Sequence, residues 1–255
     1  MMAEGMHRAL RRLESRVKLG EAARAAVLGL PAVRRKLEAQ AYLVREGDAP
    51  SQCAVLLSGY AIRHKMTGDG GRQIISLHIA GEFLDLQNSL LRVADHNVQM
   101  LVRSELAMIP VAALRGLADE HPDVARAMWI ETLVDAAIYR EWVLNVGRRN
   151  SVSRIAHLLC ELARRLEAAG LGSGSRFELP MTQEQLADAS GLTAVHINRV
   201  LQELGRRGLV VRDRRMVEIR DWDGLRAVGD FSARYLHLPE APGWDAGSPI
   251  NAAAA

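Results

Sequence analysis

The sequence predicts an α+β fold in three parts: an N-terminal β-roll similar to a double-stranded jelly roll, a long helix, and a C-terminal winged helix-turn-helix. Two observations predict this fold. Short β-prone runs separated by glycine turns fill residues 40–110, and a helix-turn-helix pattern followed by two strand-like runs fills residues 181–220. We expect one domain over residues 1–146, a second over 147–238 and a flexible tail over 239–255.

The composition is that of a globular protein with room for two modest domains. The chain has 255 residues, of which 49% are hydrophobic and 25% charged, and its net charge is only +3. Overall basicity is therefore weak evidence for nucleic-acid binding, but arginine is concentrated after residue 146 and suits contacts with phosphate and guanine. No apolar run has membrane-spanning length and no signal peptide is evident, so we expect a cytoplasmic protein without membrane contact.

The two cysteines argue against a metal or redox centre. Cys53 and Cys160 lie far apart, form no CxxC pair and have no ligand-type residues at metal-binding spacing. We expect two buried thiols, no metal and no cofactor. His78 stands between apolar residues and is expected to be a packed core histidine; a haem ligand is the alternative.

Residues 40–110 predict the strands of the β-roll. Turn residues such as Glu46-Gly47-Asp48 and Gly68-Asp69-Gly70-Gly71 separate the runs. The second of these turns precedes a strand rather than a helix, so it predicts a hairpin and not a phosphate-binding loop. The expected strands cover residues 41–44, 53–57, 60–66, 73–79 and 98–109.

A long amphipathic helix is predicted over about residues 123–146. Its apolar residues recur close to heptad spacing, and its small residues allow a second helix to approach. We expect a two-fold dimer contact, although packing on its own domain explains the same pattern. The expected dimer residues are Ile130, Val134, Ala137, Ile138 and Leu144.

The stretch Asn145 to Asn150 interrupts this pattern with Gly147 and two arginines. It predicts a hinge between the two domains. Ser151 is then expected to cap a further helix that ends at about Ala169.

The segment Met181 to Val210 predicts the helix-turn-helix. Thr182 is a good N-cap, and Gln185 three residues later completes a capping box. Gly191 stands where the turn needs a left-handed residue, and Thr193 caps the second helix. The buried stripe of the second helix comprises Ile197, Val200, Leu201 and Leu204.

The second helix has a polar face near its N-terminus, which is where a recognition helix reads bases. A plain helical bundle also contains two short helices around a glycine turn. The strand–turn–strand pattern and the arginines that follow favour a DNA-binding wing instead. We expect base contacts from Ala194, Val195, Asn198 and Arg199, and backbone contacts from Thr182, Thr193, His196, Arg212, Arg214 and Arg215.

The order of these elements, together with three short motifs, resembles the Crp/Fnr family of bacterial transcription regulators. The motifs are Val44-Arg45-Glu46-Gly47-Asp48, Leu56-Leu57-Ser58-Gly59 and Gly81-Glu82-Phe83, and the resemblance spans roughly residues 39–222. It implies a cyclic-nucleotide-binding-type sensor domain, a homodimer on an inverted repeat of double-stranded DNA, contact with RNA polymerase and control of transcription.

The resemblance also implies an effector pocket, which this sequence alters. In cyclic-AMP-binding members, an Arg-Ser/Thr-Ala triplet holds the phosphate. The aligned triplet here is Ala94-Asp95-His96, and an aspartate repels phosphate, so we expect no response to cyclic AMP. The candidate pocket residues are Gly81, Glu82, Phe83, Arg92 and Asp95, with Arg92 out of register.

Base reading follows from the same resemblance. In characterised relatives, a glutamate and an arginine four residues apart read the half-site. Val195 stands at the glutamate position and Arg199 matches the arginine, so Arg199 is expected to read a guanine through O6 and N7. Val195 offers only apolar contact, for example to a thymine methyl, and Asn198 can pair with adenine or bind phosphate.

Two other functions were weighed against a ligand-independent regulator. A regulator gated by a cyclic nucleotide or another small molecule near Gly81 and Glu82 is the alternative, with an unknown effector. An enzyme is not expected, because the chain has no nucleophile elbow, Walker loop or HExxH motif.

Overall fold

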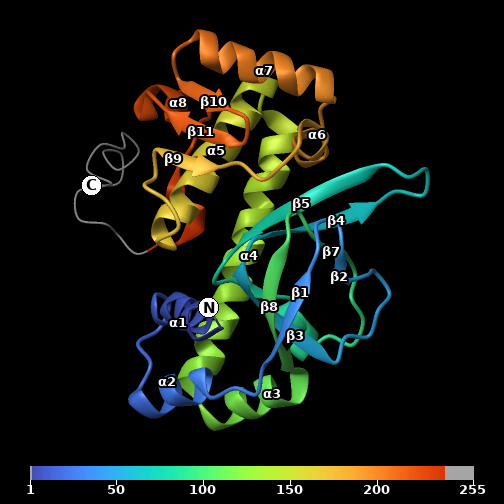
Figure 1. The fold of residues 1–255 in the computed structure, drawn as a ribbon, viewed down its shortest axis with the longest axis vertical. Helices are drawn as coiled ribbons and strands as arrows, with labels where there is room; N and C mark the ends of the chain where they lie inside the picture. Colours follow the sequence, from blue (N-terminus) through green and yellow to red (C-terminus); the bar gives the residue numbers. More distant parts are fainter. Residues whose placement is uncertain (1, 239–255) are drawn as a thin grey trace.

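The computed structural model describes residues 2–238 and arranges them along one long helix, α4 (Figure 1). The β-roll and the N-terminal helices lie on the lower half of α4, and the winged-helix domain lies around its upper end. The expected flexible tail, 239–255, lies outside the described residues. Within residues 2–238, the helices are all too short or too polar to cross a membrane.

The β-roll is built from two four-stranded antiparallel sheets. One has the order β1-β8-β3-β6 and the other β2-β7-β4-β5. A 3-10 turn, η1 (Leu86–Ser89), follows β6. The strands are β1 (Val33–Leu37), β2 (Tyr42–Val44), β3 (Gln52–Ser58), β4 (Tyr60–Met66), β5 (Arg72–Ile79), β6 (Phe83–Leu84), β7 (Asn97–Met100) and β8 (Ser104–Pro110).

The single strand predicted over residues 98–109 is wrong, because the chain changes sheets there. β7 pairs with β2 and β4, whereas β8 pairs with β1 and β3. Both strands are buried for most of their length, and the three residues between them, Leu101 to Arg103, include no glycine or proline that would have marked the turn. Gly59 makes the tight crossing from β3 to β4, with a φ of +94°, and a Cβ there would lie 2.2 Å from Ser104 Oγ.

Helices cover one face of the roll. The helices α1 (Met2–Glu14), α2 (Glu21–Leu28) and α3 (Val111–Glu120) pack with the start of α4 (Pro122–Arg148) on the sheet that contains β3. A separate apolar cluster fills the interior between the two sheets. A third runs without interruption from β4 and β5 through α4 into the C-terminal domain, so the two domains share a core.

The predicted hinge over residues 145–150 is wrong in extent. Helix α4 continues through Gly147 to Arg148, and only Arg149 and Asn150 separate it from α5 (Ser151–Ala168). Asn150, not Ser151, caps α5: its Oδ1 accepts the Ser153 N–H at 3.0 Å. Asn145 holds the junction by donating to the Arg154 carbonyl at 3.2 Å. A helical glycine costs only about 1 kcal/mol, which such contacts offset.

The stripe of α4 predicted to form the dimer faces the protein's own core. Val134 and Ile138 are buried in the shared cluster, Ile130 packs against it, and Ala137 is buried as well. Of the five predicted residues, only Leu144 is exposed. The alternative, packing within the chain, explains this stripe, because β5 and α5 lie against the same face of α4.

The C-terminal domain has the expected winged-helix order. Its three-stranded sheet runs β10-β11-β9 and packs with α5, α7 and α8. The short strand β9 was not expected, because its three residues alternate too briefly to be recognised. The elements are β9 (Arg176–Glu178), α6 (Gln183–Ser190), α7 (Ala194–Arg206), β10 (Val210–Asp213), β11 (Met216–Ile219), α8 (Trp222–Val228) and η2 (Ala233–Leu236).

Candidate nucleic-acid interface and effector site

The local geometry of the helix-turn-helix confirms its sequence signals. Thr182 Oγ1 accepts the Gln185 N–H at 3.2 Å, and Gln185 Oε1 accepts the Thr182 N–H at 2.8 Å. Gly191 has a left-handed φ of +64° and ends α6. Thr193 caps α7 by accepting the His196 N–H at 3.3 Å. Together these contacts set the angle between α6 and α7.

Helix α7 lies at one end of the molecule (Figure 1), and one of its faces is exposed. Val195 is 65% exposed, and His196, Asn198 and Arg199 are exposed as well, whereas Ala194 is half-buried. Asn198 Oδ1 accepts a long hydrogen bond of 3.4 Å from Gln183. Within residues 2–238, the Arg199 guanidinium has no polar partner, so its five N–H donors are available.

The wing turns between β10 and β11. Arg214 adopts a left-handed φ of +53°, and its carbonyl accepts from Arg212 Nε at 3.0 Å. Arg215 makes only a 3.7 Å surface ion pair with Glu178. The structure therefore places the exposed Arg212, Arg214 and Arg215 together on the wing.

The predicted effector residue Glu82 is buried and fully engaged by other residues of the chain. Its carboxylate lies 2.9 Å from an Arg165 nitrogen, 3.0 Å from an Arg12 nitrogen and 2.9 Å from His78 Nδ1. Burial alone raises the pKa of Glu82, but the charges of Arg12 and Arg165 outweigh it, and the pKa lies well below its usual range. Glu82 is thus a permanent anion in an internal ion-pair network.

A second ion-pair network lies between β4, η1 and α4. Arg63 Nε donates to Asp85 at 2.9 Å, Arg63 Nη1 donates to Asp135 at 2.9 Å, and His96 Nε2 lies 3.0 Å from Asp85. Burial raises the pKa of Asp85, but Arg63 and then His96 outweigh it and lower the pKa to about 2. These side chains occupy the region beside η1 where an effector contact was expected.

The structure does not bring the five predicted pocket residues together. Arg92 and Asp95 are exposed, and the side chain of Asp95 is 85% accessible with His96 as its near neighbour at 2.7 Å. Phe83 is buried in the core beneath the N-terminal helices. Gly81 lines one cavity together with arginines of α1, and Glu82 and Phe83 line a separate, much smaller one. A single effector pocket formed by all five residues stays a prediction.

The sequence analysis did not identify the two arginines that pair with Glu82. Arg12 and Arg165 lie 70 residues before and 83 residues after Glu82. The signal for Arg12 was available, because Arg8, Arg11, Arg12 and Arg16 recur at helical spacing. No local signal marks Arg165, which stands on an otherwise ordinary amphipathic helix.

The buried thiols and the core histidine are confirmed. Cys53 and Cys160 are buried, and burial raises the pKa of each thiol to about 12. His78 is buried between Ser76 at 2.9 Å and Glu82. Nowhere in residues 2–238 do three His, Cys, Asp or Glu side chains group to hold a metal ion.

The fold and the exposed face of α7 define a class of protein: a β-roll sensor-type domain fused to a DNA-binding winged helix. Residues 34–121 match the cyclic nucleotide-binding domain, and residues 153–228 match the Crp-like helix-turn-helix domain. The chain belongs to the Crp/Fnr family of transcription regulators.

Individual relatives agree with this assignment. The nitrogen fixation regulation protein FixK of Rhizobium meliloti is 27% identical over 186 residues, covering 72% of this chain and 81% of that protein. The transcriptional activator FnrL of Cereibacter sphaeroides is 27% identical over 203 residues, covering 78% and 81%. The structure of FixK2 from Bradyrhizobium japonicum superposes with a TM-score of 0.73 at 22% identity, covering 80% of this chain and all of that one.

Proposed function

We propose that this Crp/Fnr-type regulator acts in the cytoplasm as a homodimer, reads an inverted repeat of DNA through α7 and does not respond to cyclic AMP. The observation that supports it most directly is the exposed, unpaired guanidinium of Arg199 at the outer face of α7. A free arginine in that position donates a bidentate pair to guanine O6 and N7. Contact between the DNA-bound dimer and RNA polymerase would complete its role in transcription.

The dimer surface that we propose lies beside the predicted stripe on α4. Trp129, Leu133 and Val143 are 67%, 52% and 73% exposed. With Ala136 and Arg140 between them, they recur at alternating intervals of four and three residues, which is the spacing of a two-helix seam. Exposed aromatic and aliphatic side chains at that spacing favour a second copy of α4 as the partner.

The absence of a cyclic AMP response is supported by the state of Glu82 and Asp95. The family resemblance implies that Glu82 would meet the ribose hydroxyl of a cyclic nucleotide. Glu82 is already paired with two arginines and a histidine, so that hydroxyl would have to displace one of these partners. Asp95 stands in the aligned phosphate triplet and faces solvent. Titration calorimetry with cyclic AMP is expected to show no heat of binding, and a saturable heat would overturn this part of the proposal.

The DNA-reading role is tested by selecting random duplexes with the purified protein and sequencing those that bind. We expect an inverted repeat with a guanine in each half-site. Arg199→Ala should lose the preference at that guanine, at a cost of about 1–3 kcal/mol. Arg212→Ala, on the wing, should weaken binding to all sequences alike, because a phosphate contact carries no base information. An unchanged preference in Arg199→Ala would remove Arg199 from this role.

The dimer is tested by sedimentation equilibrium. Leu133→Glu should convert the dimer to a folded monomer, because it places a charge in the centre of the proposed seam. Val33→Glu is the matched control, since Val33 is 68% exposed on β1 and lies outside the seam. Equal dimerisation of the two variants would place the interface elsewhere.

A further inference from the structure

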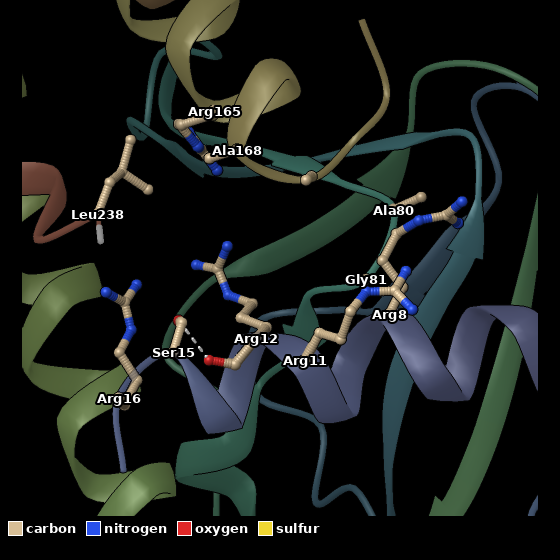
Figure 2. Close-up of a pocket in the computed structure, with 11 residues that line it drawn as sticks. Arg8, Arg11, Arg12, Ser15, Arg16, Ala80, Gly81, Arg165, Ala168 and Leu238 are labelled. Atoms are coloured by element: carbon tan, nitrogen blue, oxygen red, sulfur yellow. Dashed lines mark hydrogen bonds between the residues drawn. The ribbon is translucent and has the colours of Figure 1, made fainter. Parts of the chain in front are cut away.

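An arginine-lined cavity lies between α1, the turn after β5 and the C-terminal end of α5. Its volume is about 130 Å³, and Figure 2 shows Arg12 reaching across it from α1 toward Arg165 on α5. Among residues 2–238, five arginines line the cavity and no acidic side chain does. They are Arg8, Arg11, Arg12, Arg16 and Arg165.

Helical spacing explains why three of these arginines converge. Arg8, Arg11 and Arg12 fall on one face of α1, and Ser15 and Arg16 follow in the turn after the helix ends at Glu14. The opposite face is apolar and packs on the β-roll, which fixes the rotation of α1. The buried residues of that face are Met6, Ala9, Leu10 and Leu13.

Gly81 brings the β-roll close to this basic face. Its φ is +95°, and a Cβ there would lie 2.8 Å from Arg8 Cγ. On the opposite wall, Ala168 and Ala169 have small side chains that leave the space open. The cavity therefore results from the packing of three separate segments.

Acidic side chains outside the cavity lining neutralise only part of its positive charge. Glu131 pairs with Arg12 and Arg16, while Glu82 pairs with Arg12 and Arg165. Those pairs account for three of the five arginines. The remaining two are Arg8, which has one exposed acidic partner, and Arg11, which has no acidic partner among residues 2–238.

Arg8 is paired only with Glu4, whose side chain is 67% exposed, at 3.2 Å. Within residues 2–238, Arg11 has neither an ion pair nor a hydrogen bond through its side chain. The Nε atoms of Arg8 and Arg165 are buried without an acceptor. Arg165 itself is 5% exposed, so its unused donor belongs to a side chain held inside the protein. These two Nε atoms have almost no surface open to the cavity, so an anion there would instead supply acceptors to the terminal nitrogens of Arg8 and Arg11.

We propose that this cavity binds a small phosphate-bearing anion that ties the winged-helix domain to the β-roll. Several guanidinium groups around one small space suit the many acceptor oxygens of a phosphate. A phosphate or pyrophosphate group is compact enough to enter the cavity. The rest of a larger metabolite would project outward past the exposed Arg11.

A ligand here would act on DNA binding through α5. Arg165 belongs to the helix against which α7 packs, whereas Arg8 and Arg11 belong to α1 on the β-roll. An anion bound to both sides stabilises the arrangement in which the two domains share a core. This regulatory consequence rests on the proposed function, but binding of the anion does not.

Calorimetry of the full chain with sodium pyrophosphate, in buffer of matched ionic strength and without DNA, tests the site. The variant Arg8→Gln/Arg11→Gln keeps the Glu82 and Glu131 ion pairs intact. It should bind pyrophosphate at least tenfold more weakly than the unaltered protein. Arg35→Gln, an exposed arginine on β1, is the control and should bind with unchanged affinity. Circular dichroism establishes that all three proteins are folded.

Two results would overturn the proposal. One is no saturable heat with pyrophosphate up to about 1 mM, a concentration that detects even weak binding. The other is equal affinity in Arg8→Gln/Arg11→Gln and in Arg35→Gln. A parallel titration with citrate separates the ligand classes, because equal affinity for citrate would remove the assignment to phosphate. Since DNA is absent, each of these failures leaves DNA recognition through Arg199 standing.

Discussion

Glu82, in the turn between β5 and β6, and Arg165, on the first helix of the winged-helix domain, form a buried ion pair with hydrogen bonds of 2.9 and 3.1 Å. Both side chains are at most 5% exposed. Burial by itself lowers the pKa of Arg165, but Glu82 and Glu161 outweigh it and raise that pKa. This contact connects the sensor-type domain to the DNA-binding domain through two permanent charges.

Glu82→Gln should therefore destabilise the protein strongly. Removing one member of a buried pair costs about 3–5 kcal/mol, and here it leaves Arg165 with only Glu161 and Arg12 with only Glu131 as acidic partners. Glu105→Gln is the control, because Glu105 pairs with the exposed Arg34 and such surface pairs contribute about 0–1 kcal/mol. Urea denaturation measures how much each variant lowers the free energy of unfolding. Equal losses in the two variants would show that the Glu82 network contributes nothing beyond an ordinary surface pair.

Gly59→Ala should impair folding of the β-roll. The new Cβ would lie 2.2 Å from Ser104 Oγ at a φ of +94°, so backbone strain and overlap combine. Gly47→Ala is a matched control, since its φ is +91° but nothing lies within 4 Å of a Cβ there. We expect a distinctly larger fall in melting temperature for Gly59→Ala. Comparable falls would attribute the whole effect to backbone conformation.

Stability should decline as the pH falls from about 6.5 to about 4. Burial, then the charge of Arg72, lowers the pKa of His64 to about 4, and burial, then Arg149, does the same for His157. The unfolded chain therefore binds protons in this window that the folded protein does not, and stability present above about pH 6.5 is lost through it. Denaturant unfolding at pH 7, 6, 5 and 4 measures the slope.

His64→Phe isolates one contribution to that slope. Both ring nitrogens of His64 are buried without a partner, and the ring packs edge-on against Tyr42 at 5.8 Å between centroids. A phenyl ring keeps that contact and removes two unsatisfied polar atoms, so we expect equal or greater stability at pH 7 and a shallower pH dependence. A less stable variant with an unchanged slope would mean that His64 is paired in solution.

The two thiols should resist modification in the folded protein. Cys53 and Cys160 are 1% and 0% exposed, and burial raises both pKa values to about 12, so the reactive thiolate is scarce. Ellman's reagent should react with neither thiol in buffer and with both in guanidinium chloride. Rapid reaction of one thiol without denaturant would show that its surroundings open in the native state.

Much of the DNA-binding half was predictable because its signals are local. A capping box acts over three residues, and a glycine turn is set by one φ angle, so Thr182, Gln185 and Gly191 were placed without the fold. The exposed face of α7 followed from the buried stripe on its other side. The same approach failed on α4, where a single apolar stripe could face either a partner or the protein's own β5 and α5.

The sequence by itself determined the order of the three main parts, the helix-turn-helix and the exposure of Arg199, since their signals depend on residues within a few positions of one another. Only the tertiary structure decided which face of α4 is buried and which residues engage Glu82. It also decided that α1 and α5 enclose a basic cavity. The physical reason is that these features depend on pairs such as Arg165 and Glu82, 83 residues apart, whose approach is set by the packing of whole elements.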